Sequence, residues 1–389
     1  AYPFVAWYYV GDGNDLVLLW RETSLAAWGK NANGQLGNNT VTALNVPAAV
    51  DQSGALAGKT IVQVARGSEH SLALTTEGRV YSWGSNSTGQ LGNNTTVTSL
   101  MPVAVSTSAA NSALSNKFVV AIAAGGSHSI ALCSDGTVVA WGANTSGQLG
   151  DFSNTQRNAP TNVWSYSANN PLAKNKATAI AAGTSYSLAL CSDGSLAAWG
   201  SNVNGQLGDG TTSSSNVPIA VNTDSGTSAL FGKWVSAIAA GSSHNLALCT
   251  DGTLASFGGN SSGQLGDGTT VNRNSPVLVQ ADNPSSAIYG KVVSAIAAGS
   301  SHSLALCSDG MVVAFGSNNS GQLGNGTTIQ SSLPGTVSTD RGISALFGKW
   351  VSAISAGGTH NLVLCSDGSL AAWGSNSNGQ LGDGSASQR

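Results

Sequence analysis

The sequence predicts an all-β fold, a seven-bladed β-propeller built from seven tandem repeats of about 58 residues. The tetrapeptide Gly-Gln-Leu-Gly recurs at spacings of 55 and then five times 58 residues. Most copies contain two alternating apolar runs joined by Asp-Gly, which is a strong hairpin signal, and no segment has a useful helical apolar period. The tetrapeptides begin at Gly34, Gly89, Gly147, Gly205, Gly263, Gly321 and Gly379.

One copy illustrates the four strands expected in each blade. Residues 235–241 form an Ala-rich first strand, and residues 244–248 and 254–258 form the hairpin that follows. A fourth strand comes after the Gly-Gln-Leu-Gly loop and contains Pro276. Proline lacks the N–H donor of a central strand, so this strand belongs on the outer edge. We expect the small first-strand residues at the crowded axis, and the Trp or Phe of each third strand between neighbouring blades.

Composition excludes several classes of protein. Only 8% of the residues are charged and the net charge is −3, so the chain lacks the basic surface of a nucleic-acid binder. A hydrophobic content of 41% is enough for a folded core. No apolar run approaches the roughly 18 residues of a membrane span. Because the repeats fill the chain, we expect residues 1–389 to form a single β-propeller domain.

The repeat, written A-G-x-x-H-S/N-L-A-L-x-x-D-G-x-x-x-x-W-G-x-N-x-x-G-Q-L-G, resembles that of the regulator of chromosome condensation family, in particular its bacterial members. The resemblance covers essentially the whole chain and implies a propeller. It does not imply one activity, because the family includes a nucleotide exchange factor, a photoreceptor and a secreted enzyme inhibitor. The Gly-Ser-Ser-His and Gly-Gly-Ser-His loops lack the arginines that the photoreceptor carries there, which argues against light perception.

Histidines and cysteines each occupy one repeat position. A ring of histidines is compatible with metal binding or base catalysis, but we favour hydrogen-bonded structural residues because successive blades repeat the position. The cysteines should be too far apart for disulfides, so we expect free, half-buried thiols. The histidines are His70, His128, His244, His302 and His360, and the cysteines are Cys133, Cys191, Cys249, Cys307 and Cys365.

Departures from the repeat are the candidate binding residues. Asp15 and Tyr186 replace the histidine in two copies, and Arg66 and Glu69 are charged residues beside that position in another. The loop 163–176 is unlike its counterparts and contains aromatic and basic residues typical of binding anchors. The candidates are therefore Asp15, Arg66, Glu69, Trp164, Tyr166 and Tyr186.

Five lysines form another repeated set, each eleven residues before the histidine position. They either attract an anionic partner or simply close a solvated turn, and we favour the second interpretation. The aspartates after Gly-Gln-Leu-Gly are interpreted as turn-capping residues, because no bidentate Glu accompanies them as in a calcium site. We expect no metal and no cofactor. The lysines are Lys59, Lys117, Lys233, Lys291 and Lys349.

The first copy is divergent, and we expect it to lack one outer strand. There are seven hairpins but six Pro-marked strands, and the chain ends at Arg389, shortly before another such strand would begin. An unpaired strand edge is a template for strand addition. We therefore expect either a longer precursor or an assembly edge for self-association or strand complementation near the aromatic residues Trp7, Tyr8 and Tyr9.

These observations favour a non-catalytic binding or assembly module whose rim loops engage a protein or glycan partner. We expect a bacterial exported or surface protein, with a cytoplasmic location as the alternative, that binds no nucleic acid and does not insert into membranes. Two alternatives stay open, a carbohydrate-active enzyme on a propeller scaffold and a regulator of a small GTPase. The enzyme is disfavoured because the sequence has no paired carboxylates, nucleophile elbow or metal-ligand cluster.

Overall fold

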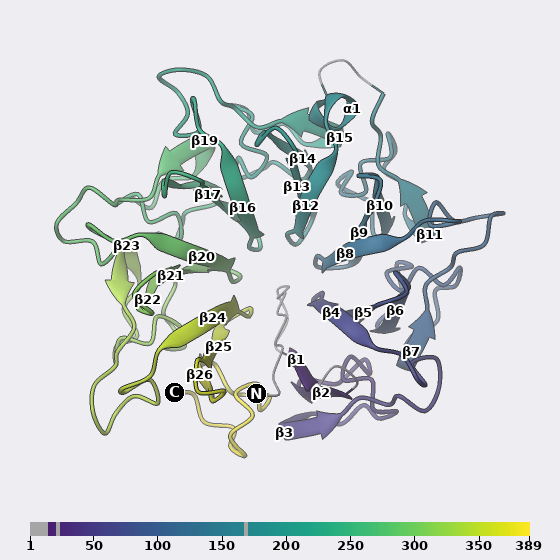
Figure 1. Ribbon diagram of the computed structural model, residues 1–389, viewed down its shortest axis with the longest axis horizontal. Coiled ribbons are helices and arrows are strands. Elements are labelled where there is room, and N and C mark those ends of the chain that lie inside the picture. Colours follow the sequence, from purple (N-terminus) through teal and green to yellow (C-terminus); the bar gives the residue numbers. More distant parts are fainter. Residues whose placement is uncertain (1–14, 21–23, 167–169) are drawn as a thin grey trace.

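The computed structural model describes residues 15–20, 24–166 and 170–389, which form a ring of antiparallel β-sheets around a central axis (Figure 1). These residues make five sheets of four strands and two sheets of three strands. The prediction of an all-β propeller is therefore confirmed. The one helix among them, α1 (Pro171–Lys174), is a single turn.

Six of the sheets formed by the described residues begin with a strand next to the axis. Alanine and isoleucine residues of all these strands except the first line a cavity of about 380 Å³ at the axis. These inner strands are β4 (Ile61–Arg66), β8 (Val119–Ala124), β12 (Ala177–Ala182), β16 (Val235–Ala240), β20 (Val293–Ala298) and β24 (Val351–Ala356).

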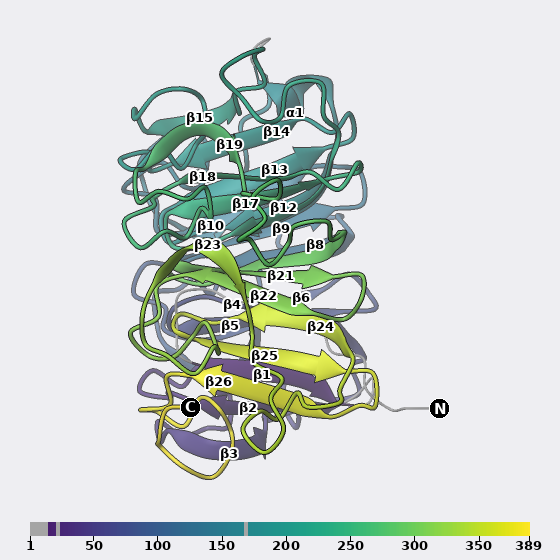
Figure 2. The same ribbon diagram turned by 90° about the vertical axis from the view of Figure 1, so that its left-hand side faces the viewer.

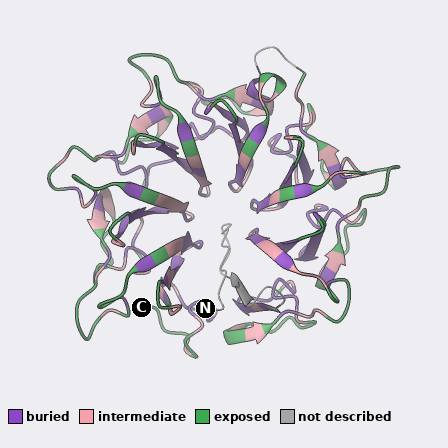
Figure 3. Ribbon diagram, in the orientation of Figure 1, coloured by how far each residue is buried: buried purple, intermediate pink, exposed green. Residues whose placement is uncertain are grey.

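In these six sheets the second and third strands form the predicted hairpin and are buried almost throughout (Figure 3). The second strands are β5 (His70–Thr75), β9 (His128–Cys133), β13 (Tyr186–Cys191), β17 (His244–Cys249), β21 (His302–Cys307) and β25 (His360–Cys365). The third strands are β6 (Val80–Gly84), β10 (Val138–Gly142), β14 (Leu196–Gly200), β18 (Leu254–Gly258), β22 (Val312–Gly316) and β26 (Leu370–Gly374).

The Pro-containing strands form the outer edges, as expected from the missing proline donor. They contain more exposed residues than the hairpin strands do. These outer strands are β7 (Ser99–Ala104), β11 (Arg157–Asn162), β15 (Ser215–Ala220), β19 (Arg273–Leu278) and β23 (Ser331–Thr336).

The number of blades differs from the prediction. The first sheet contains β1 (Asp15–Trp20), β2 (Ser24–Gly29) and β3 (Leu44–Ala49), and β1 corresponds to the second strand of the other sheets. The described residues therefore hold six blades with an inner strand rather than seven. The prediction of seven blades came from counting one Gly-Gln-Leu-Gly loop in each copy. This loop follows the hairpin, so its presence does not show whether an inner strand precedes the hairpin.

The prediction that the first copy lacks an outer strand is wrong. Strand β3, which contains Pro47, pairs with β2 through Ala26 opposite Ala49. The sheet without an outer strand among the described residues is β24–β26. Each Pro-marked strand pairs with the hairpin that precedes it in the chain, so the strand that contains Pro47 serves the first copy. Trp7, Tyr8 and Tyr9 lie outside the described residues.

Large aromatic residues fill the space between sheets, as predicted. Trp141 on β10 is fully buried and packs with Leu72 and Val80 of the preceding sheet. The first and last sheets lie side by side (Figures 1 and 2) and share a cluster that includes Trp28 and Leu362. The indole N–H of Trp28 donates to the carbonyl oxygen of Gln380 at 3.1 Å.

Candidate functional site

Four of the five histidines join neighbouring sheets. Nε2 of His70 lies 2.9 Å from Oγ of Ser129 in the next sheet, and Oγ of Ser129 donates to the carbonyl oxygen of Gln90 at 2.9 Å. Because that hydroxyl uses its proton on Gln90, it accepts from Nε2–H of His70. His302 is bound in the same sense, since Nε2 lies 2.7 Å from Oδ1 of Asn361, which is an acceptor. The structural interpretation of these two histidines is therefore confirmed, and the same contact holds His128 and His244.

Burial keeps the imidazoles neutral. Desolvation lowers the pKa of His70, His244 and His360 to about 3, and that of His128 and His302 to about 4. Nδ1 of each ring has no hydrogen-bond partner, and Nε2 of His360 has none either. A neutral ring with its proton on Nε2 fits a structural contact between blades and leaves no exposed base.

Tyr186 replaces one of these histidines and is also structural. The side chain is fully buried, and its hydroxyl donates to the carbonyl oxygens of Gly241 at 3.1 Å and His244 at 2.7 Å. The hypothesis that Tyr186 contributes to an exposed binding site is therefore wrong. A tyrosine reaches backbone acceptors in the next blade, so the replacement preserves the link between blades.

The cysteines are free and buried, so the expectation of unpaired thiols is confirmed. Burial raises the pKa of Cys133, Cys191, Cys249 and Cys307 to about 11, and also raises the pKa of Cys365. A thiol with a raised pKa is a poor nucleophile at neutral pH. The cysteine positions thus belong to the packed interior of the sheets.

Each repeated lysine forms an ion pair with the acidic residue of its own hairpin turn. Lys233 and Lys291 lie 2.6 Å from Asp251 and Asp309, and Lys117 and Lys349 pair in the same way with Asp135 and Asp367. Lys59 lies 3.6 Å from Glu77. The favoured interpretation, a lysine that closes a turn, agrees with this geometry, and the pairing removes most of the positive charge available to an anionic partner.

The charged candidates are not brought together with the aromatic loop. Arg66 is 3% exposed at the axial end of β4. Glu69 is partly buried and pairs with Lys30 at 3.0 Å. The side chain of Asp15 lies outside the described part of the molecule. Trp164 and Tyr166 belong to a different part of the ring, between β11 and β12.

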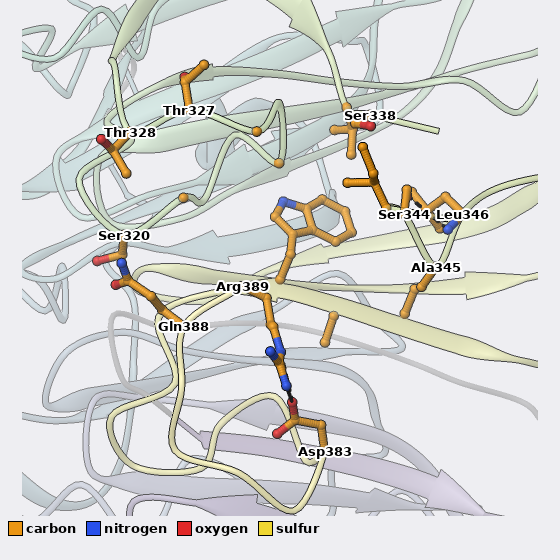
Figure 4. A pocket seen from close by; sticks show the side chains of 18 residues that line it. Ser320, Thr327, Thr328, Ser338, Ser344, Ala345, Leu346, Asp383, Gln388 and Arg389 are labelled. Carbon is orange, nitrogen blue, oxygen red and sulfur yellow. Dashed lines mark hydrogen bonds and ion pairs between the residues drawn. The ribbon is translucent and has the colours of Figure 1, made fainter. Parts of the chain in front are cut away.

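A cavity of about 660 Å³ follows the outer edge of β26 (Figure 4). Its lining includes Trp373, Leu346 and Arg389. The backbone of Arg389 exchanges two hydrogen bonds with Gly374, which matches the pairing of Arg157 with Gly142 in a four-stranded sheet. The cavity therefore lies where an outer strand runs in the other sheets. We attribute it to the pairing of strands in the propeller.

Phe152, Trp164 and Tyr166 form a compact aromatic cluster on the surface. The rings of Phe152 and Trp164 are stacked with centroids 5.2 Å apart, and Tyr166 meets Trp164 edge-on at 5.2 Å. Phe152 is 65% exposed and Tyr166 is 80% exposed. Trp164 and Tyr166 were predicted from the sequence, whereas Phe152 was not. Its signal was a bulky residue at a repeat position that holds Gly or Asn in the other copies.

A second exposed group, here named the apolar arc, lies on three consecutive loops that each lead into an inner strand. Its members are 52–61% exposed. They occupy two repeat positions, two residues before and one residue after the repeated lysine. The apolar arc consists of Phe231, Trp234, Tyr289, Val292, Phe347 and Trp350.

Contacts with the hairpin turns place the apolar arc on one face of the ring. A Cβ on Gly194, in the turn of the preceding blade, would lie 2.9 Å from the ring of Trp234, and Gly310 has the same relation to Trp350. The carbonyl oxygen of Trp234 accepts from the N–H of Thr250 in its own hairpin. Each tryptophan therefore covers the seam between two hairpin turns and keeps its other surface exposed.

No group of three metal-ligating side chains occurs among the residues described. Within the same residues, no helix has the length and apolar character needed to cross a membrane.

The family model described as an RCC1-like domain matches residues 24–389. The chain is 33% identical over 364 residues to the mouse E3 ubiquitin-protein ligase HERC2, covering 93% of this chain but 7% of that protein. It is 30% identical to the Ultraviolet-B receptor UVR8 of Arabidopsis thaliana, covering 94% of this chain and 76% of the receptor. The chain thus spans a small part of HERC2 and most of UVR8.

Solved structures show the same fold. Human WBSCR16 matches with a TM-score of 0.79 and 22% identity, over 94% of this chain and 92% of that one. Prp20p from Saccharomyces cerevisiae, described with its binding properties to Gsp1p and histones, matches with a TM-score of 0.74 and 24% identity, over 98% of this chain and 85% of that one.

Proposed function

Because the chain belongs to the RCC1-like domain family, we propose that it is a non-catalytic propeller that binds a protein partner through the apolar arc. The observation that carries this proposal is the half-exposure of six large apolar side chains at matching positions of three consecutive blades. Soluble surfaces rarely keep such groups exposed without a binding role. Loops on a rigid scaffold are also the usual location of binding residues.

The chemistry of the apolar arc favours a protein partner. Aromatic side chains are enriched in the buried centre of protein interfaces, and tryptophan and tyrosine often carry much of the binding energy. The neighbouring Lys233–Asp251 and Lys291–Asp309 pairs are neutral overall and exposed. They are suited to a polar rim that excludes water from an apolar contact.

We also propose that the ring counts seven blades, with the sheet β1–β3 as the seventh, and that residues 1–389 act as one domain. The support is the bond between Trp28 and Gln380, which repeats the link between consecutive blades elsewhere in the chain. In such a ring the three blades that bear the apolar arc are adjacent, so a single partner can contact all of them.

Site-specific photo-crosslinking tests the proposal. A photoreactive phenylalanine analogue is placed at position 234 or 350 of the full chain, or at Val203, a control residue that is 71% exposed outside the apolar arc. After irradiation in an extract of the source organism, we expect one protein to be captured from positions 234 and 350 and not from 203. The captured protein must then bind the purified chain. Identical adducts from all three positions would contradict the proposal.

A further inference from the structure

Phe152 has a backbone conformation that disfavours its side chain. Its φ angle is +64°, in the left-handed region where a bulky residue is strained. The equivalent residues have similar positive φ angles but are of types that tolerate them. These residues are Asn39, Asn94, Gly210, Gly268, Gly326 and Gly384. The chain thus holds an exposed aromatic ring at a position where every other copy has a small or turn-forming residue.

The aromatic cluster is held in place by its surroundings. The N–H of Trp164 donates to the carbonyl oxygen of Gly150 at 2.7 Å, and Nδ2 of Asn170 donates to the carbonyl oxygen of Trp164 at 2.6 Å. Phe152 stacks on Trp164 on one side and is exposed on the other. A ligand that stacks on Phe152 would therefore meet a ring whose position is already fixed, which lowers the cost of binding.

A polar hollow of about 300 Å³ has Asn216 in its lining, and the backbone of Asn216 contacts that of Phe152. The N–H of Phe152 donates to the carbonyl oxygen of Asn216, and the side chain of Asn216 donates to Oδ1 of Asn154 at 3.0 Å. The nearest carboxylate along the chain, Asp151, is paired with Arg157 at 2.7 Å. The residues that line the hollow are uncharged amides and hydroxyls, namely Ser146, Asn154, Ser214, Ser215 and Asn216.

We propose that the aromatic cluster and the polar hollow bind a neutral carbohydrate. A sugar ring presents C–H groups on its faces, which pack on aromatic rings, and hydroxyls at its rim, which pair with amide and hydroxyl side chains. Binding sites typically combine apolar surfaces with a few such polar groups in this way. The uncharged lining does not supply the cations that a phosphorylated or acidic ligand needs. This site lies on other blades than the apolar arc and does not depend on a protein partner there.

Native affinity electrophoresis tests the carbohydrate site. The full chain is run in gels that contain hydroxyethylcellulose, mixed-linkage β-glucan, xylan, galactomannan or dextran, and in a gel without polysaccharide. We expect at least one polysaccharide to retard the chain. Phe152→Gly should weaken that binding about tenfold or more, equivalent to about 1.4 kcal/mol. Four copies already have Gly here, so the variant should fold, and its thermal melting is measured in parallel.

Two controls make the outcome decisive. Tyr166→Ala should also weaken retardation, whereas Phe118→Ser should not, because Phe118 is a 48% exposed aromatic residue elsewhere on the ring. The proposal is overturned if no polysaccharide in the panel retards the wild-type chain, or if Phe152→Gly is retarded as strongly as the wild type. Loss of a protein partner by Phe152→Gly, with no polysaccharide binding in the wild type, would assign the cluster to protein recognition instead.

Discussion

The indole N–H of Trp28 donates to the carbonyl oxygen of Gln380, which lies 352 residues later in the chain. The same bond joins consecutive blades elsewhere, as from Trp141 to Gln90 at 2.9 Å. The Gln residue of the repeated tetrapeptide therefore has a structural role, because its carbonyl oxygen accepts a hydrogen bond from the tryptophan of the next blade. At Trp28 this bond joins the two ends of the described ring.

We expect Trp28→Phe to lower the free energy of unfolding more than Trp141→Phe does. Both variants lose an indole donor, but Oγ of Ser129 still donates to Gln90 in the second one. The residue equivalent to Ser129 in the first sheet is Leu16, which has no side-chain donor. An unpaired buried carbonyl costs about 1–3 kcal/mol. Chemical denaturation of the two variants measures the difference, and equal losses would show that the Trp28 bond does not matter for closure.

The free energy of unfolding should fall as the pH is lowered, over a pH range set by the pKa values of the histidines. Their pKa values of about 3 to 4 in the folded chain lie below the ordinary value of 6.5. Below pH 6.5 the unfolded chain therefore binds more protons than the folded chain does. The histidines do not reduce the free energy of unfolding above that pH, and this free energy declines as the pH falls towards 4. Each such histidine contributes up to about 1.4 kcal/mol per pH unit.

Thermal melting between pH 7.5 and pH 4.5 measures this decline. His128→Tyr is the matched variant, because the chain itself carries a tyrosine, Tyr186, at the same repeat position. The variant should show a shallower decline than the wild type, since one titrating group is removed. Identical slopes of melting temperature against pH would mean that protonation of His128 does not contribute to the loss of stability. The aspartates with lowered pKa values act in a separate window, below about pH 4.

The five thiols should resist modification in the folded chain. Burial holds the pKa of Cys133, Cys191, Cys249 and Cys307 at about 11, so little thiolate exists at pH 8. A chromogenic disulfide reagent should react slowly with the native chain and rapidly with all five cysteines in denaturant. Rapid reaction of one or more thiols in the native chain would contradict their burial.

Phe152→Gly should leave the free energy of unfolding within about 1 kcal/mol of the wild type. Removing the strained left-handed residue gains roughly 1–2 kcal/mol, while losing the stacked ring and adding glycine flexibility costs a similar amount. Phe257→Gly provides the contrast, because that ring is fully buried and its removal should cost at least about 3 kcal/mol. A comparable loss at position 152 would mean that Phe152 belongs to the core.

Much of the fold was predictable because residues with the same structural role occur at the same position in several copies of the repeat. The Asp-Gly turns, the Pro-marked edges and the histidine position each recur, so their structural roles could be inferred from sequence. The pairing of Lys233 with Asp251 was not foreseen, because the sequence shows both residues but not that the loop brings them to the same turn.

The candidate site was only partly predictable. Trp164 and Tyr166 were found because their loop differs from its counterparts, whereas Tyr186 was misjudged because a buried tyrosine can satisfy its hydroxyl on backbone carbonyls. Phe152 was missed although it departs from the Gly or Asn of the other copies. The exposure of the apolar arc depends on how each loop packs on the next hairpin, which the repeat pattern alone does not reveal.

The most direct test of the apolar arc as a binding surface is a calorimetric titration. The partner identified by photo-crosslinking is titrated with the purified variants. Trp234→Ser combined with Trp350→Ser removes two members of the apolar arc, and Phe118→Ser changes the same repeat position in a blade outside it. We predict that the double variant binds at least about tenfold more weakly, equivalent to about 1.4 kcal/mol, while Phe118→Ser binds like the wild type. Equal affinity of the partner for all three proteins, each with an unchanged melting temperature, would contradict the proposal that the apolar arc is the binding surface.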